Sequence, residues 1–186
     1  NSNNSDGTKL LYLVKSWLRG KEVKIHIIGC SGTGKSYLAK RLSEKYNIPH
    51  FDLDDIFWDN SSDRYGVKMP DEKRNQLLDD ILRKNNWIIE GVFYDWLDGS
   101  FRDADVIILL DIPKRVYRFR IIRRFVKRKL GMERAKKETL SSLVALLKWT
   151  DKFQDKNLPR IYEKLGKYPD KTIILHSRRE VNDYIK

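Results

Sequence analysis

The stretch of residues 29–36 reads GCSGTGKS and matches the pattern G-x-x-x-x-G-K-[ST] at every fixed position. Glycines at this spacing let the backbone curl so that consecutive N–H groups point inward at an anion. A mostly apolar run, residues 23–28, precedes the stretch, and Leu38, Ala39 and Leu42 follow it at the spacing of a buried helix face. The order of strand, glycine loop and helix therefore predicts a phosphate-binding loop.

Each part of such a loop has an expected role. Lys35 would reach the outer phosphates of a nucleotide, and the Ser36 hydroxyl would bind Mg²⁺. The other candidates for nucleotide binding are the remaining loop residues and the residue that follows them: Gly29, Cys30, Ser31, Gly32, Thr33, Gly34 and Tyr37. The stretch thus predicts ATP and Mg²⁺ as cofactors, and the alternative is a glycine-rich turn that binds no ligand.

Length and composition fit one cytoplasmic domain. A chain of 186 residues suffices for a single α/β core. No apolar run approaches the roughly 20 residues of a membrane helix, so we expect no segment that spans a membrane. The single cysteine, Cys30, excludes an intramolecular disulfide and a cysteine-based metal cage. We expect a monomer or homodimer in a reducing compartment.

The chain divides into two expected parts. Residues 1–20 combine a polar tail with an amphipathic helix, whose apolar positions are Leu10, Leu13, Val14, Trp17 and Leu18. That helix face either packs on the domain or binds a membrane surface or a partner. Residues 21–186 are expected to form the phosphate-loop domain, with an acceptor-side insert at about 55–85 and a lid region at about 114–160.

Further short apolar runs predict strands that end in acids. The predicted strands are residues 23–28, 49–53, 87–91, 106–111 and 172–175. Open parallel sheets bind ligands at the carboxyl ends of their strands. This places Asp52, Asp54 and Glu90 beside the phosphate loop.

Several roles are open for these acids. Asp52 and Asp54 share one side of the strand, provided that the strand extends to Asp54. One of them would hold Mg²⁺ through water, with Asp52 the candidate alongside Ser36, and the other would meet the acceptor. Alternatively, Asp54 caps the next helix. Glu90 would position metal-bound water, accept the acceptor's proton, or serve as a simple turn residue.

Positive charge is concentrated in one segment. The net charge is +12, and residues 111–138 contain twelve Lys or Arg against three acids. Residues 114–130 predict a helix on which Arg120, Arg124 and Arg128 recur every four residues. Like charges at this spacing destabilise a bare helix by a few tenths of a kcal/mol per pair, and a bound anion would remove that repulsion. Arginine forks suit phosphoryl oxygens, so the helix is either a phosphoryl clamp or a solvated basic face.

These motifs together resemble phosphate-loop kinases of the adenylate-kinase and shikimate-kinase kind. The likeness is greater to the adenylate-kinase-like proteins known as DNA topology modulation proteins. The motifs that carry it are GCSGTGKS at 29–36, PHFDLDDIFW at 49–58, WIIEG at 87–91, LDIP at 110–113 with Arg120 and Arg124 beyond it, and LHSRREV at 175–181.

The resemblance implies a three-layer α/β fold. Its sheet would have five parallel strands in the order 2-3-1-4-5, with helices on both faces and a mobile lid that carries Arg120 and Arg124. The resemblance also implies an adenine pocket near Ser177 and Arg178, and a D-x-D pair, Asp52 and Asp54, that addresses Mg²⁺ and the acceptor. The family usually has Asp-Gly-Asn-Tyr where this chain has EGVF at 90–93, so the acceptor is left unassigned.

The sequence therefore predicts a kinase that transfers the γ-phosphoryl group of ATP to a nucleotide, a nucleoside or a hydroxylated metabolite. The catalytic candidates are Lys35, Arg120, Arg124, Asp52, Asp54 and Glu90. The alternative is a nucleotide-regulated DNA-binding protein that modulates DNA topology through the arginine helix. An NTPase switch is a further rival, but the chain shows no evident water-positioning residue or coupling region for it.

Overall fold

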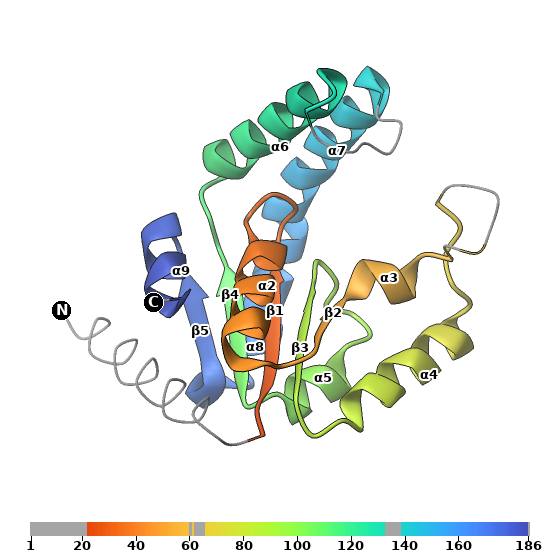
Figure 1. The fold of residues 1–186 in the computed structure, drawn as a ribbon, viewed down its shortest axis with the longest axis vertical. Helices are drawn as coiled ribbons and strands as arrows, with labels where there is room; N and C mark the ends of the chain where they lie inside the picture. Colours follow the sequence, from red (N-terminus) through yellow and green to blue (C-terminus); the bar gives the residue numbers. More distant parts are fainter. Residues whose placement is uncertain (1–21, 60, 62–65, 133–138, 186) are drawn as a thin grey trace.

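The computed structural model describes residues 22–59, 61, 66–132 and 139–185. Within them, five strands form one parallel sheet in the order β2-β3-β1-β4-β5 (Figure 1), which confirms the predicted order. The strands are β1 (Lys24–Gly29), β2 (His50–Asp52), β3 (Trp87–Gly91), β4 (Val106–Leu110) and β5 (Thr172–Leu175).

Helices connect the strands and cover both faces of the sheet. They are α2 (Lys35–Tyr46), α3 (Leu53–Phe57), α4 (Asp71–Leu82), α5 (Asp98–Asp103), α6 (Lys114–Lys129), α7 (Leu140–Lys152), α8 (Leu158–Leu165) and α9 (Arg178–Ile185). A π-helical segment (Phe153–Asn157) joins α7 to α8, and a 3₁₀ turn (Pro169–Lys171) precedes β5.

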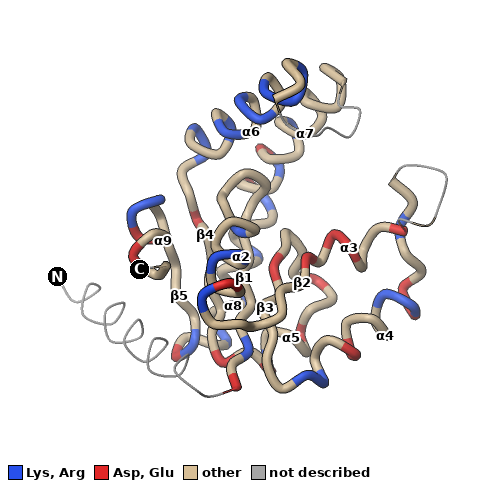
Figure 2. Tube along the Cα trace, viewed as in Figure 1, with Lys and Arg blue, Asp and Glu red and all other residues tan. Residues whose placement is uncertain are grey.

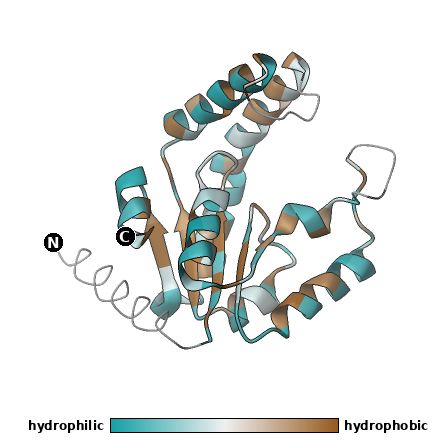
Figure 3. Ribbon diagram, viewed as in Figure 1, coloured by the Kyte–Doolittle hydropathy of each residue, from teal (hydrophilic) through white to brown (hydrophobic). Residues whose placement is uncertain are grey.

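The two faces of the sheet have separate apolar cores. On one face, strand side chains pack against α2 and α9 through residues such as Leu38 and Val181. On the other face, they pack against α5 and α8 through residues such as Phe101 and Ile161. Every residue of β4 is buried, as expected for a strand that is covered on both sides. The predicted three-layer arrangement is thus confirmed, and apolar residues concentrate along the strands in Figure 3.

Helices α6 and α7 lie side by side and extend beyond the sheet from the carboxyl end of β4 (Figure 1). The chain stays helical from Leu140 to Leu165. Pro159 has no amide hydrogen, but it lies in the first turn of α8, where no hydrogen bond depends on it. The π-helical segment therefore carries the helix past the proline.

The structure shifts the first predicted strand by one residue, to Lys24–Gly29, and shortens two others. β2 ends at Asp52, and β4 ends at Leu110 instead of Asp111. The carboxylate of Asp52 accepts a hydrogen bond from the Asp54 amide at 2.9 Å and caps α3. The prediction that Asp52 and Asp54 lie on one strand face is wrong because this local cap ends the strand before Asp54. The amphipathic helix predicted within residues 1–20 lies outside the described residues.

A histidine is buried in the middle of β1. His26 is fully buried, its Nδ1 lies 2.8 Å from the Ser100 hydroxyl, and its ring packs on Phe101 at 4.5 Å between centroids. Burial lowers the pKa of His26 from 6.5 to about 3, so the folded protein holds this imidazole neutral at every pH above that value.

We predict a pH-dependent difference in stability between the protein and its His26→Asn variant, in which the amide replaces the ring as a neutral partner of Ser100. The unfolded chain binds a proton at His26 below about pH 6.5, and the folded protein does not. The stability that neutral His26 provides is therefore lost as the pH falls from 6.5 toward 3. In urea unfolding, lowering the pH from 7 to 5 should cost the wild type about 2 kcal/mol more than the variant. Parallel pH profiles would contradict a buried neutral histidine.

Candidate functional site

The loop between β1 and α2 lies at the carboxyl edge of the sheet and is shaped by two glycines. Gly32 and Gly34 have positive φ angles of 79° and 107°, which L side chains rarely adopt. A Cβ atom on Gly32 would also lie 3.0 Å from the carbonyl oxygen of Tyr117 and 3.0 Å from a side-chain carbon of Ile121. Glycine at position 32 thus lets α6 pack directly on the loop.

Lys35, the first residue of α2, reaches back across this loop. Its Nζ donates a hydrogen bond to the carbonyl oxygen of Cys30 at 3.0 Å, and its side chain is buried. Burial lowers the pKa of Lys35, while the negative charge of Glu90 opposes that shift most strongly. The ammonium group therefore lies between the loop backbone and the acids of neighbouring strands.

Three arginines converge on the loop from two other elements. Arg120 of α6 donates hydrogen bonds through Nη1 to the carbonyl oxygens of Thr33 (2.9 Å) and Gly32 (3.4 Å). A pocket of about 350 Å³ lies between residues 32–37 on one side and Arg120, Arg124, Arg178 and Val181 on the other. Burial and the nearby charge of Arg178 lower the pKa of Arg120. Cations held this close together suit a polyanionic ligand.

Acids gather on the other side of Lys35. Asp52 of β2 and Glu90 of β3 are neighbours in the sheet register, so they lie beside each other at the ends of adjacent strands. Burial raises the pKa of Glu90, while the charge of Lys35 and then the Ser36 hydroxyl oppose the shift. Burial, followed by the charge of Asp52, raises the pKa of Asp54. We call Asp52, Asp54 and Glu90 the acid edge. Figure 2 shows acidic residues along β2 and α3, and basic residues along α6 and at the start of α9.

An aromatic wall borders the acid edge. It consists of Phe57 and Trp58 at the end of α3, and Phe93 and Trp96 in the segment after β3. The rings of Phe57 and Phe93 stack at 4.2 Å between centroids. The guanidinium of Arg74, from α4, lies 4.5 Å from the Trp96 ring centre. Sequence reasoning missed Phe93 and Trp96, although the density of aromatic residues directly after Glu90 was the available signal.

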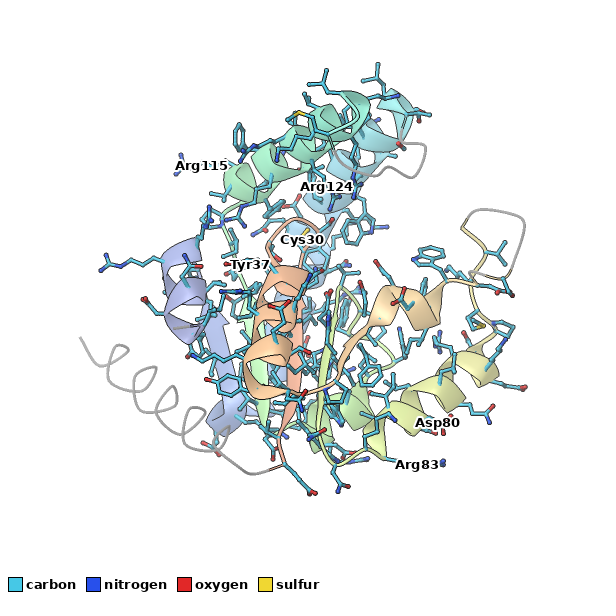
Figure 4. All side chains as sticks on the ribbon, in the orientation of Figure 1. Cys30, Tyr37, Asp80, Arg83, Arg115 and Arg124 are labelled. Atoms are coloured by element: carbon cyan, nitrogen blue, oxygen red, sulfur yellow. The ribbon has the colours of Figure 1, made fainter. Side chains whose placement is uncertain are left out.

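The structure brings most of the predicted nucleotide-binding residues to the pocket. The predicted nucleotide-binding residues that line it are Gly32, Thr33, Gly34, Lys35, Ser36, Tyr37, Arg120 and Arg178, and the catalytic candidate Arg124 lines it as well. Figure 4 shows Arg124 on the side of α6 that faces the loop, with Arg115 on the opposite side. Four other predicted residues do not line the pocket: Gly29, Cys30, Ser31 and Ser177.

Three of these residues have structural partners instead. The Ser177 hydroxyl donates to Glu180 at 2.8 Å and accepts from the Glu180 amide, so it caps α9. Gly29 lies so close to Leu110 that an added Cβ would be 2.9 Å from its carbonyl oxygen. Burial raises the pKa of the Cys30 thiol to about 11, so this cysteine stays protonated at neutral pH.

The residues around the loop suit the phosphates of ATP better than they suit a Mg²⁺ ion. The cationic pocket beside the loop matches a chain of phosphates. Among the described residues, no group of three or more His, Cys, Asp or Glu side chains is arranged to hold a metal ion. Ser36 and Asp52 would therefore supply only part of a Mg²⁺ shell, which fits an ion that takes its remaining ligands from phosphates and water. None of the helices that the structure describes is long and apolar enough to cross a membrane.

Comparison with curated proteins finds relatives that match this chain over part of their length. A protein described as uncharacterized, YqaC of Bacillus subtilis, is 32% identical over 50% of this chain and 51% of its own. An adenylate kinase of Clostridium kluyveri is 27% identical over 50% of this chain and 55% of its own. The chain thus spans about half the length of the curated relatives it matches.

Two further comparisons concern the family and the fold. The gluconokinase from Sinorhizobium meliloti 1021 superposes with a TM-score of 0.54 at 15% identity, over 90% of this chain and 93% of that chain. At this identity the likeness concerns the fold alone. The family model described as AAA domain matches residues 25–141, more than half of the chain. The chain therefore belongs to the AAA domain family, and its fold is that of the P-loop kinases of the adenylate-kinase and shikimate-kinase-like superfamily.

Proposed function

We propose that the protein is a P-loop kinase that transfers the γ-phosphoryl group of ATP to a small-molecule acceptor. The observation that carries this proposal is the position of Lys35, which lines the cationic pocket and interacts electrostatically with the acid edge. A donor nucleotide in the pocket and an acceptor at the acid edge would meet at this one ammonium group. The likeness to an adenylate kinase supports the same activity.

Positioning and charge stabilisation account for the chemistry. Bound Mg²⁺·ATP supplies the phosphoryl group that is transferred. The loop amides and Lys35 bind its phosphates, and Arg120 and Arg124 stabilise the charge that shifts onto the leaving group during transfer.

Ser36 and Asp52 would hold the metal ion. Glu90 and Asp54 orient the acceptor, while Tyr37 and Arg178 complete the nucleotide pocket.

We further propose that residues 114–160 act as a lid and residues 55–85 as the acceptor-side insert. Within this lid, Asp151 of α7 joins the two helices. It forms ion pairs with Lys114 of α6 at 2.7 Å and with Arg118 of α6 at 2.6 Å. Closure of α6 and α7 over the pocket would exclude water, which otherwise competes with the acceptor for the phosphoryl group.

The same charge distribution disfavours the DNA-binding alternative. α6 carries nine Lys or Arg and no acid, but Arg120 and Arg124 face the pocket. The exposed cations of the helix, such as Arg115 and Arg123, are interspersed with exposed apolar residues, including Phe119 at 66% and Ile122 at 42%. A DNA-binding face would present a continuous row of cations and bind duplex DNA with a steep dependence on salt.

We expect the Lys35→Ala variant to lose phosphoryl transfer and keep its fold. The ammonium group contacts the site of transfer, so its removal should lower turnover at least about 100-fold. Lys40→Ala is the matched control, because Lys40 lies on the same helix with a 73% exposed side chain. ATP consumption and thermal unfolding measure the two properties. Turnover retained in Lys35→Ala would contradict the assignment.

Alanine variants of two arginines of α6 should differ in their affinity for a non-hydrolysable ATP analogue. Arg120→Ala removes charged hydrogen-bond donors from the pocket, so its dissociation constant should rise about 10- to 100-fold. Arg115→Ala, on the side of the helix that faces away from the loop (Figure 4), should leave it within about 2-fold. Titration calorimetry gives both constants. Equal losses in the two variants would show that the helix acts only through its overall charge.

A further inference from the structure

The chemistry of the acid edge constrains the acceptor atom. Its carboxylates come from two strand ends and from α3, and Asp52 and Glu90 are direct neighbours in the sheet register. The buried Lys35 ammonium is already held by the carbonyl oxygen of Cys30 at 3.0 Å. A second phosphate brought to this place would add negative charge to a group of acids that already repel one another. A neutral acceptor group adds none.

One oxygen of this edge lacks a hydrogen-bond donor. Glu90 is 2% exposed, and its Oε1 is buried without a hydrogen-bond partner in the described structure. The nearest basic nitrogen recorded for it, His50 Nε2, is also buried without a hydrogen-bond partner and lies 3.9 Å away, beyond hydrogen-bond range. Buried acceptors are almost always paired, and an unpaired one is energetically costly. An alcohol O–H would provide the missing donor, whereas a phosphate dianion has no proton to give.

The aromatic wall indicates what carries that alcohol. Phe57, Phe93 and Trp96 are half-buried beside the acid edge, and their rings pack on one another. A planar apolar body can extend this packing, because aromatic faces favour stacking with other rings.

Two cations of the described chain lie over the rings of this wall. Arg74 donates to Asp71 at 2.7 Å and to Asn75 at 3.0 Å, and its guanidinium lies over Trp96. Lys68 lies over Phe57, with its Nζ 5.6 Å from the ring centre. The packed rings therefore favour a ring-bearing acceptor, and the carboxylates of the acid edge disfavour a phosphate on it.

We propose that the acceptor is a ring-bearing alcohol without a phosphate group, with the chemistry of a nucleoside instead of a nucleoside monophosphate. This acceptor class depends on the kinase activity proposed above. The alcohol oxygen forms a bond to the γ-phosphorus as the bond from that phosphorus to the β,γ-bridging oxygen breaks. ADP leaves with the bond's electrons, and the hydroxyl proton passes to a carboxylate of the acid edge. The products are a phosphate monoester and ADP.

Matched acceptor pairs test the class directly. Adenosine, guanosine, cytidine and thymidine are each compared with their own 5′-monophosphate, and glycerol and gluconate serve as alcohols without an aromatic ring. ADP formation gives the rates, and mass spectrometry identifies the phosphorylated product. We expect at least one nucleoside to be phosphorylated with a kcat/KM at least 10-fold above that of its monophosphate and of both ringless alcohols. A preferred monophosphate, a preferred ringless alcohol, or no nucleoside turnover would each overturn the proposal.

Binding of an ATP analogue distinguishes a wrong acceptor class from a wrong kinase assignment. Binding of an ATP analogue that is lost in Lys35→Ala shows a working nucleotide site even if no nucleoside is phosphorylated. If the analogue does not bind to the wild type, the kinase assignment itself is wrong.

Two substitutions test the role of the acid edge on whichever nucleoside is used best. Glu90→Gln and Asp54→Asn remove one charge each while keeping the side-chain shape. We expect kcat for the nucleoside to fall about 100-fold in Glu90→Gln and the ratio of monophosphate to nucleoside turnover to rise in both variants, with the affinity for the ATP analogue unchanged. Asp54 is much less buried than Glu90, so Asp54→Asn guards against a folding defect at the buried Glu90. Asp80→Asn, on the exposed side of α4, is the control. An unchanged ratio in both variants would contradict the role of these charges.

Discussion

All five strands run in one direction, so their carboxyl ends meet at a single edge, and every part of the candidate site depends on that alignment. β1 delivers the glycine loop, β2 and β3 deliver Asp52 and Glu90, and β4 and β5 lead into α6 and α9 with their arginines. Buried apolar strands hold this arrangement in place from both faces. The polar groups can therefore stay close together although they come from distant parts of the chain.

The resulting site is divided by charge. Arg120, Arg124 and Arg178 lie with the loop on one side of Lys35, and the acid edge lies on the other. The close packing of α6 on Gly32 keeps the arginines near the loop, because a larger residue there would collide with Tyr117 and Ile121. A site with a cationic half and an acidic half suits a reaction in which an anionic donor meets an uncharged acceptor.

Local signals in the sequence predicted the frame of this site. The glycine loop, the apolar runs of the strands and the arginine spacing depend on residues within one or two elements, and the strand order followed from the resemblance to known kinases. Prediction failed at the end of β2, where Asp52 ends the strand early by capping α3. Ser177 caps α9 and lies outside the pocket lining, and its part in nucleotide binding stays a prediction.

Features that depend on distant residues were not predictable from the sequence. His26 and Ser100 are 74 positions apart, and the aromatic wall joins Phe57 to Phe93 and Trp96. The short helix α5, which supplies Ser100 and Phe101, also escaped prediction. Such pairings form only when separate elements pack together, and no spacing within the chain encodes them.

The most direct test of the nucleotide site is a crystal structure with a non-hydrolysable ATP analogue and Mg²⁺. We predict that the phosphates lie between residues 32–36 and the arginines of α6, and that Lys35 Nζ has left the carbonyl oxygen of Cys30 for a phosphate oxygen. An analogue bound away from the loop, or phosphates on the loop with Lys35 still bonded to Cys30, would contradict this account of the site.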